Sequence, residues 1–568
     1  MNDNDKVADI IYKDKYLQPG ESFDEGMARI AGALSDSSEH FYITKEILSD
    51  KRFLPAGRIQ AAMGAVRETT PYNCFVSGTI DDSLNGITHA LSQALQTLRL
   101  GGGDGYDFST LRPSGDTIAS LQSTSCGPVG GSNTPTGFMD LFDAGCSVIR
   151  SAGHRRGAQM GVLRVDHPDI RNFISAKRNS NRLTNFNISV GITDEFMEAV
   201  ENDHQFELKF GGRVYERISA KNLWHEIMRS TWDWAEPGVL FLDTINKKNN
   251  LWYCETIAAT NPCGEQPLPP HGACLLGSFN LTKYVEQDSF NYPKLIRDIY
   301  PIVRSMDNVV DRAIYPLTEQ RDEALSKRRM GLGVLGFANA SEMMGMPYGG
   351  TESQLFLESV LFAIKHHAYR ASIEIAKEKG PFPYFNQRYL EGQFIQTLPK
   401  RIKEGIKEYG IRNSHLTSIA PTGSISLAAG NVSSGIEPTF SSGEFTRKMF
   451  MSDGTQPTFT MQDWGEANFG YKAVGADEVT AEQHVRMLNI ASQQVDSAVS
   501  KTCNVGDNVP YEDFVELYSL AYKGGASGCT TFRASGRRFG ILNAVSEESV
   551  DEGSACFIDP ETGDRTCD

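Results

Sequence analysis

The spacing of apolar residues predicts alternating strands and helices along most of the chain. Three short apolar runs are typical of buried strands: "FNISVGI" (186–192), "GVLFLDTI" (238–245) and "LTSIAP" (416–421). Longer segments repeat apolar residues every three or four positions, as helices do: residues 221–235, 292–314 and 351–380. This alternation indicates an α/β fold with a largely parallel sheet or barrel.

The same pattern divides the chain into three parts. Residues 1–70 carry helical spacing at 24–35 and 42–51, and we expect a short helical N-terminal region there. Residues 71–540 hold the alternation of strands and helices. Residues 541–568 are acidic and rich in Gly, Ser and Asp, which predicts a flexible tail, although the tail contains two cysteines.

Composition narrows the class of protein. The 568 residues are 40% hydrophobic and 22% charged, an ordinary globular balance. The start, "MNDNDKVADI", does not resemble a secretory signal, and no apolar run of about 18 residues occurs, so we expect a cytoplasmic protein without a membrane span. A net charge of −16 without a long basic run argues against nucleic-acid binding.

The cysteines do not form a recognisable framework. There are ten, spread over the whole length and without any CxxC pair, so neither a secreted disulfide scaffold nor a local zinc site is predicted. We therefore expect no metal held by the protein's own side chains.

One loop nevertheless groups reactive side chains. In "ATNPCGEQPLPPHGACLLGSFNL" (259–281) the prolines favour an extended backbone, in which alternate side chains share a face. Asn261, Cys263 and Glu265 would then point the same way and form a reaction centre. An irregular loop with a buried cysteine and a solvated glutamate explains the spacing equally well.

Three other segments are ambiguous by themselves. Cys74, in "TTPYNCFVSGTIDDSLNGI", has the surroundings of a core residue. The turn Pro421–Ser426 suits an anion such as a phosphate, although it is no Walker A loop and an ordinary turn is as good an interpretation. "LRLGGGDGYDFSTLRPSGD" (98–116) could approach a ligand closely, with Arg112 near a phosphate, but a flexible surface loop is the better interpretation of the segment alone.

The sequence also contains the residues of a dinucleotide-binding motif, but not the structural context that this motif requires. Gly331, Gly333 and Gly336 match GxGxxG, and Glu352 follows about twenty residues later. The preceding "EALSKRRM" is charged and helical rather than a strand, so the context that a nicotinamide site requires is missing.

Taken together, these segments resemble the catalytic subunit of ribonucleotide reductases. "NPCGEQPLPPHGACLLGSFNL" is similar to the finger loop of that family, and "PYNCFVSGTIDDSLNGI", "GGGDGYDFSTLRPSGD", "RRMGLGVLGFA" and "APTGSISLAAGNVSSGIEPTF" follow in the family's order. The resemblance covers about residues 10–545 and is nearest to the adenosylcobalamin-dependent class II branch. It implies a ten-stranded α/β barrel with the finger loop at its centre.

The resemblance also implies roles for individual residues. Cys263 would carry the thiyl radical, Glu265 would act as the base on the 3′ hydroxyl, and Asn261 would bind the substrate. Cys74 and Cys274 would supply two electrons and end as a disulfide. The remaining substrate contacts would come from Asn73, Gly103, Pro421, Thr422, Gly423, Ser424, Ile425 and Ser426.

The same resemblance implies how the activity is regulated and how the active-site disulfide is reduced again. Asp82 and Arg112 match the positions that bind a deoxynucleotide effector, although a second family arginine has no counterpart in "PSGDTIAS". The tail cysteines Cys556 and Cys567 would reduce the active-site disulfide by exchange and be regenerated by a thioredoxin or glutaredoxin-like protein. No ATP-cone precedes the barrel, so overall control by ATP and dATP is not expected. A homodimer and diphosphate substrates are expected.

The radical source is inferred by elimination. Thr531 and Phe532 stand where class I chains have a tyrosine pair, and no glycyl-radical motif is present, which leaves adenosylcobalamin. The alternative within the family is a class I-like chain that needs a ferritin-like partner and uses Tyr518 or Tyr522 as a relay. More distant alternatives are an NAD-dependent dehydrogenase and a nucleotide-binding scaffold without activity.

Overall fold

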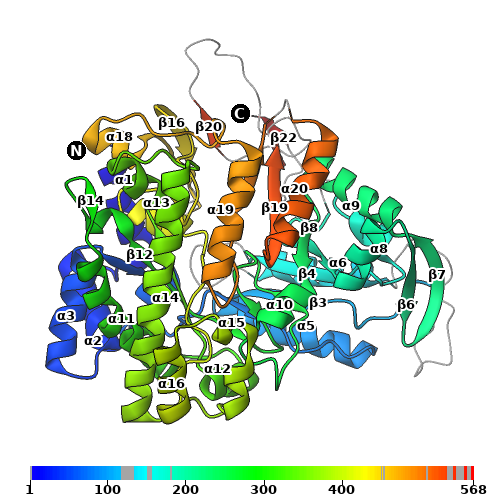
Figure 1. The fold of residues 1–568 in the computed structure, drawn as a ribbon, viewed down its shortest axis with the longest axis horizontal. Coiled ribbons are helices and arrows are strands. Elements are labelled where there is room, and N and C mark those ends of the chain that lie inside the picture. The colour runs from blue at the N-terminus through cyan, green and yellow to red at the C-terminus, as the bar shows by residue number, and fades with distance from the viewer. Residues whose placement is uncertain are drawn as a thin grey trace.

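The computed structural model describes residues 3–116, 134–149, 157–178, 182–449, 451, 454–506, 509–533, 542–544, 556–558 and 565–567. These residues form a mixed α/β structure in which helices surround two sheets (Figure 1). The larger sheet has eight described strands in the order β11-β2-β3-β4-β5-β8-β19-β18, and the smaller has the order β1-β12-β15.

Two groups of parallel strands make up these sheets. The first group is β2 (Cys74–Val76), β3 (Gly103–Asp107), β4 (Gln159–Arg164), β5 (Phe186–Ile192) and β8 (Gly238–Phe241). Strand β19 (Gly528–Arg533) lies antiparallel to β8, and β18 (Thr502–Val505) lies parallel to β19. In the smaller sheet β12 (Leu276–Asn280) lies parallel to β15 (Gly331–Leu335) and antiparallel to β1 (Phe53–Pro55).

The two sheets are linked by pairings at both ends. Strand β11 (Ala273–Cys274) is antiparallel to β2, and Leu275 alone separates it from β12. At the other end, parallel bridges join Leu332 to Thr417 and Ile419 to Val499, just before β18. The predicted strand at 416–421 therefore contributes these single bridges and no regular strand.

Helices cover the outer faces of the sheets. One apolar core lies between the β3-β4-β5-β8 face and helices α5, α6, α9 and α20, and a second, larger core lies around β12, β15 and helices α11 and α14. Both cores bury aromatic side chains completely, including Tyr106 and Phe186 in the first and Phe279 and Tyr369 in the second. The principal helices are α5 (Leu84–Arg99), α6 (Pro135–Val148), α7 (Ile170–Ile174), α8 (Asp194–Glu201), α9 (Ala220–Trp234), α10 (Leu242–Lys248), α11 (Tyr292–Arg312), α12 (Thr318–Lys327), α13 (Phe337–Met343), α14 (Thr351–Lys379), α15 (Gln393–Gln396), α16 (Lys400–Tyr409), α17 (Gly423–Ala428), α18 (Trp464–Phe469), α19 (Ala481–Gln494) and α20 (Tyr511–Lys523).

The N-terminal region is helical, as its periodicity predicts. It contains α1 (Asp3–Ile11), α2 (Phe23–Leu34), α3 (Ser38–Ser49) and α4 (Gly57–Ala62). Ser22 and Glu25 form a reciprocal capping box that fixes the start of α2. In Figure 1 α2 and α3 lie at the opposite end of the molecule from α8 and the β6 (Gln205–Phe210)–β7 (Arg213–Ser219) hairpin.

Two local expectations need correction, and a third feature agrees with what was expected. The run 238–245 is a strand only to Phe241, and α10 begins at Leu242. The glycine segment expected as a surface loop contains the buried strand β3. The glycines of the GxGxxG motif lie in and directly after β15, where a Cβ on Gly333 would come within 2.3 Å of the Ser418 carbonyl oxygen, so close packing explains them without a dinucleotide.

The tail contains two short paired strands. Strands β21 (Cys556–Ile558) and β22 (Arg565–Cys567) are antiparallel, and their register places Cys556 opposite Cys567. None of the described helices has the length and apolar character that crossing a membrane requires.

Candidate active site

The loop that carries Cys263 is the tip of a tight hairpin. Strands β9 (Ala259–Thr260) and β10 (Pro267–Leu268) are antiparallel, and the backbone N–H of Gln266 donates to Oδ1 of Asn261 at 2.9 Å. The N–H of Gly264 donates to the carbonyl of Asn261 at 3.0 Å, with Gly264 at a φ of +81°. The extended backbone expected across 261–265 is therefore wrong, because glycine permits a left-handed turn there.

Two glycines of β3 let this hairpin approach the sheet. A Cβ on Gly105 would lie 2.0 Å from the carbonyl oxygen of Thr260, and one on Gly103 would lie 3.2 Å from Cγ of Pro262. Any larger residue at position 105 would thus displace the hairpin. The glycines of "GGGDG" allow this close approach, but the sequence pattern alone does not predict it.

The hairpin tip is held from both groups of strands. Asn187 of β5 donates from Nδ2 to the carbonyl of Pro262 at 2.9 Å. From the opposite side, Oγ of Ser418 and the N–H of Ala498 donate to the carbonyl of Glu265 at 2.8 and 3.0 Å. The backbone on either side of Cys263 is therefore fixed to segments that lie far apart in the sequence.

The structure brings Cys74 and Cys274, the two cysteines predicted to form the dithiol, together. Cys74 and Cys274 are directly opposite each other in the β2–β11 pair, and both are buried. Burial raises the pKa of the Cys274 thiol well above its ordinary value, and the neighbouring charges of Glu265, Cys74 and Cys263 raise it further. Cys274 is thus a protonated thiol at neutral pH, within electrostatic reach of all three groups.

Several buried polar atoms around this centre have no hydrogen-bond partner in the described part of the chain. They are Oδ1 of Asn73, Nδ2 of Asn261 and both side-chain polar atoms of Gln266. Orphaned buried polar atoms are costly and commonly mark a place where a ligand or water binds. Gln266 was not singled out from the sequence, and its position directly after Glu265 in the finger motif is the signal that could have identified it.

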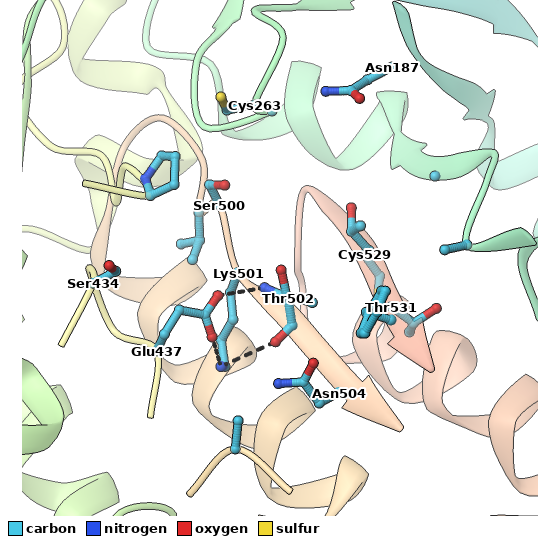
Figure 2. Close-up of a pocket in the computed structure, with 18 of the residues that line it drawn as sticks. Asn187, Cys263, Ser434, Glu437, Ser500, Lys501, Thr502, Asn504, Cys529 and Thr531 are labelled. Atoms are coloured by element: carbon cyan, nitrogen blue, oxygen red, sulfur yellow. Dashed lines mark hydrogen bonds and ion pairs between the residues drawn. The ribbon is translucent and has the colours of Figure 1, made fainter. Parts of the chain in front are cut away.

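A cavity of about 640 Å³ opens beside Cys263. Its wall comes from β5, β8, β18, β19, the hairpin tip and the segment 431–440. Figure 2 shows Cys263 and Asn187 at one end of this space and Glu437, Lys501 and Thr502 at the other. Lys501 pairs with Glu437 at 2.7 Å, and the same carboxylate accepts the N–H of Thr502 at 2.7 Å.

The segment Pro421–Ser426 begins a short helix at the edge of the cavity. Pro421 lines the cavity, Thr422 has a left-handed φ of +51°, and α17 begins at Gly423. Oγ1 of Thr422 accepts the N–H of Gly435 at 2.7 Å, which fixes the turn. A Cβ on Gly423 would meet no atom within 4 Å, so the space beside the turn is open.

The predicted effector residues contact each other. Arg112 donates from Nε and Nη2 to the carboxylate of Asp82 at 3.0 and 2.6 Å, and Nη1 of Arg112 is buried without a partner in the described residues. The segment "SAKRNSNRLTNFNISV" (175–190) is where the family resemblance places a loop that links the effector site to the substrate site, and its residues 179–181 lie outside the described residues.

The alternative relay tyrosines both lie on α20. Tyr518 packs in the helical layer outside the first group of strands, with its hydroxyl 2.9 Å from Oγ1 of Thr531. Tyr522 donates to Oδ1 of Asp194 at 2.9 Å.

Within the described ranges no group of three or more His, Cys, Asp or Glu side chains is arranged to hold a metal ion.

Comparison with known proteins shows which proteins are similar to this chain. Residues 72–463 match the family model described as "Ribonucleotide reductase, barrel domain". The chain is 35% identical to the vitamin B12-dependent ribonucleoside-diphosphate reductase of Mycobacterium tuberculosis over 84% of this chain and 70% of that protein. The protein of the same name from Thermoplasma acidophilum is 33% identical, over 93% of this chain and 69% of its own length. The large subunit of the variola virus ribonucleoside-diphosphate reductase is more distant, 27% identical over 72% of this chain and 58% of that protein.

Proposed function

The chain belongs to the ribonucleotide reductase family, and from this premise we propose that it reduces ribonucleoside diphosphates with adenosylcobalamin as its cofactor. The diphosphate substrate and the cofactor are taken from the names of the relatives in Mycobacterium tuberculosis and Thermoplasma acidophilum. The convergence of Cys263, Glu265, Cys74 and Cys274 is the single observation that carries the proposal, because this chemistry needs a radical thiol, a base and a dithiol at one place.

We also propose that the two sheets close into a ten-stranded barrel within residues 71–540. The pairings support a ring: β2-β3-β4-β5-β8, then β19-β18, the bridged segment 417–419, β15 and finally β11–β12, which returns to β2. Each half would contain five parallel strands, and the halves would meet at the antiparallel β8–β19 and β2–β11 seams. The finger hairpin would then occupy the interior and exclude water from the radical.

The proposed reaction assigns one task to each residue. As a thiyl radical, Cys263 takes the hydrogen atom from the 3′ carbon, and Glu265 accepts the proton of the 3′ hydroxyl. The 2′ hydroxyl leaves as water with a proton from one thiol of the dithiol. The hydrogen of the other thiol passes to the 2′ carbon, and the two electrons of the dithiol reduce the sugar while a Cys74–Cys274 disulfide forms. Glu265 then returns its proton to the 3′ oxygen. Cys263 returns its hydrogen atom to the 3′ carbon and is a thiyl radical again.

The raised pKa of Cys274 suits this task. A thiol that stays protonated can donate to the leaving hydroxyl, whereas a thiolate could not. The orphaned atoms of Asn73 and Asn261 would bind the ribose, beside Gly103. The turn of Pro421, Thr422, Gly423, Ser424, Ile425 and Ser426 would hold the phosphates at the start of α17.

The cavity beside Cys263 is the place where we expect the reactive end of the proposed cofactor to bind. It adjoins the thiol directly, and Phe440 and Phe445 give its wall apolar surface for a large organic group. When bound, adenosylcobalamin supplies the radical chemistry that no side chain provides. The protein's own contribution is to hold Cys263 at the end of this cavity through the contacts of Pro262 and Glu265.

Partners and regulation complete the proposal. The tail hairpin would bring Cys556 and Cys567 together as a dithiol that reduces Cys74–Cys274, and a cytoplasmic thioredoxin or glutaredoxin-like protein would reduce the tail. A deoxynucleotide effector would bind at Asp82 and Arg112 of a homodimer, after separating the ion pair that these two residues now form.

The test is reduction of CDP and GDP by the purified chain, without oxygen or a second subunit. Dithiothreitol and matched deoxynucleotide effectors are present, and adenosylcobalamin is added or omitted. Deoxynucleotide formed only with the cofactor supports the proposal, and Cys263→Ala should abolish it. Product that requires a ferritin-like protein instead would favour the class I alternative, with Tyr518→Phe and Tyr522→Phe as the next variants.

A further inference from the structure

Arg447 lies in the wall of the Cys263 cavity, and the direction of its pKa shift differs from that of the other described arginines with a shifted pKa. Arg447 lies on β16 (Glu444–Lys448), the middle strand of a three-stranded antiparallel sheet with β17 (Thr458–Gln462) and β20 (Leu542–Ala544). Alternate residues of a strand share a face, and Phe445 and Arg447 both line the cavity. Lys448, on the other face of the same strand, is exposed.

Arg447 is partly buried, and no described residue forms a side-chain hydrogen bond or ion pair with it. Burial lowers the pKa of Arg447, and among the residues that the structure describes no carboxylate charge raises it again. For other described arginines with a shifted pKa, neighbouring carboxylates raise the value: Arg164, Arg171, Arg304, Arg328 and Arg329. Because a guanidinium remains charged at any ordinary pH, Arg447 keeps a desolvated positive charge at the cavity.

The other charged groups of the cavity wall already have partners. Lys501 pairs with Glu437 at 2.7 Å, and Glu236 pairs with Lys177 at 2.7 Å. The carboxylate of Asp463 accepts hydrogen bonds from Asn339, Thr439 and the backbone N–H groups of Gly465 and Glu466. None of these carboxylates is therefore positioned to neutralise Arg447.

We propose that Arg447 is an anion-binding residue of this cavity and recognises a phosphate ester of the molecule that enters it. The inference rests on the proposed function for the identity of that molecule. A planar guanidinium with five N–H donors matches the oxygens of a phosphate and binds two of them at once. A partly buried cation that has no partner among the described residues is costly, and a bound anion offsets that cost.

Two ligands of the proposed reaction carry this chemistry. The substrate has a diphosphate, and adenosylcobalamin has a phosphodiester in its nucleotide loop. Arg447 would therefore set either substrate or cofactor affinity, and pairs of ligands with and without phosphate distinguish the two. They are CDP against cytidine, and adenosylcobalamin against adenosylcobinamide, which lacks the nucleotide loop.

The experiment measures equilibrium binding of these four ligands and of inorganic pyrophosphate by titration calorimetry. Arg447→Gln should weaken binding of one phosphate-bearing ligand about 10- to 100-fold, the range expected for a hydrogen-bonded charge pair. Its phosphate-free counterpart should bind unchanged. Arg447→Lys should restore part of the affinity, since it keeps the charge without the planar fork.

The matched control is Lys448→Gln, which removes the same charge from the opposite face of the same strand. It should leave every affinity unchanged, and a loss equal to that of Arg447→Gln would overturn the proposal. Equal binding of all phosphate-bearing ligands by the wild type and Arg447→Gln would also overturn it, even with catalysis intact. If the wild type binds none of the phosphate-bearing probes, the anion site is likewise refuted.

Failure of the proposed function has a different signature. Pyrophosphate binding that depends on Arg447, in a chain that forms no deoxynucleotide, would retain the anion site and reject the reductase reaction. Circular dichroism and thermal unfolding of each variant establish that it is folded. If Arg447→Gln does not fold, Arg447→Lys becomes the test variant. Unchanged affinity of Arg447→Lys for every phosphate-bearing ligand would then refute the proposal.

Discussion

Cys74 and Cys274 are opposite each other in the antiparallel β2–β11 pair, so the register of one short pairing creates the dithiol. Cα atoms at such positions are about 4.5–5.5 Å apart, within the range that a disulfide bridges. The backbone therefore needs little movement when the dithiol is oxidised.

The first prediction concerns this dithiol. Turnover of CDP without added reductant should produce a Cys74–Cys274 disulfide, detectable by peptide mapping under non-reducing conditions. Cys274→Ser should abolish deoxynucleotide formation, because a hydroxyl cannot supply the electrons. The control is Cys254→Ser, since Cys254 is exposed. The tail pair Cys556–Cys567 can also become oxidised, by exchange with this disulfide. A turnover-dependent disulfide that joins any pair other than these two would contradict the assignment.

The second prediction concerns the approach of the finger hairpin to β3. Gly105→Ala would place a methyl group 2.0 Å from the Thr260 carbonyl oxygen, so the hairpin must move. Displacement of a reacting group by about 1 Å can cost about 100-fold in rate, and we expect a loss of that order in kcat/KM.

Gly32→Ala is the matched control for Gly105→Ala. A Cβ on Gly32, inside α2, would have an ordinary contact of 3.9 Å with Phe41, and alanine is the better helix former. This variant should keep full activity and equal or higher stability. Wild-type kinetics for Gly105→Ala would show that the hairpin position does not limit catalysis.

The third prediction is a dependence of stability on pH. Burial raises the pKa of Asp104, on β3, from 3.8 to about 8. Between these values the folded chain retains a proton that the unfolded chain releases, so this residue makes stability fall as pH rises from about 4 to about 8. Asp104→Asn carries no such proton and should be more stable than the wild type at pH 8, by about 1 kcal/mol or more.

Urea unfolding at pH 4 and pH 8 measures this effect. The advantage of Asp104→Asn over the wild type should shrink toward pH 4, because that pH is close to the unfolded pKa of 3.8 and little of the pH-dependent loss of stability has accumulated there. Asp288→Asn, at an exposed position, provides the comparison and should follow the wild type at both values. An advantage that does not vary with pH would refute the linkage.

Local patterns were sufficient to predict the long helices. The segments 221–235 and 351–380 were expected as helices, and α9 and α14 occupy 220–234 and 351–379. Their apolar stripes repeat over several turns, so each helix is encoded by its own residues. The strand 186–192 was equally clear, because β5 is a short and largely buried run with strands on both sides.

The site depended on contacts that no local pattern contains. Strand β3 is buried because Gly103 and Gly105 admit a hairpin encoded at residues 259–268. The turn at Gly264 was predicted as extended because prolines flank it, yet the bonds of Pro262 and Glu265 to distant strands determine its shape. The resemblance supplied the catalytic roles, and chemical patterns alone left Cys74 as a core residue.

The last prediction concerns the buried ion pair at the far end of the cavity. Burial lowers the pKa of Lys501, but the charge of Glu437 outweighs it and the net shift is upward. Glu437→Gln would leave Lys501, whose side chain has no exposed surface, without its counter-charge. Removing one partner of a buried pair is strongly destabilising, and because Glu437 is 25% exposed we expect the free energy of unfolding to fall by about 1–3 kcal/mol.

Chemical denaturation of Glu437→Gln and of Glu482→Gln separates this effect from general loss of charge. Glu482 pairs with Arg486 on the exposed surface of α19, and such pairs contribute less than about 1 kcal/mol. Glu482→Gln should therefore unfold within about 0.5 kcal/mol of the wild type. Since the Glu437 carboxylate also accepts the N–H of Thr502, which lines the cavity, Glu437→Gln should weaken cofactor binding as well. Equal stability of the two variants would mean that the Lys501–Glu437 pair contributes no more than a surface pair.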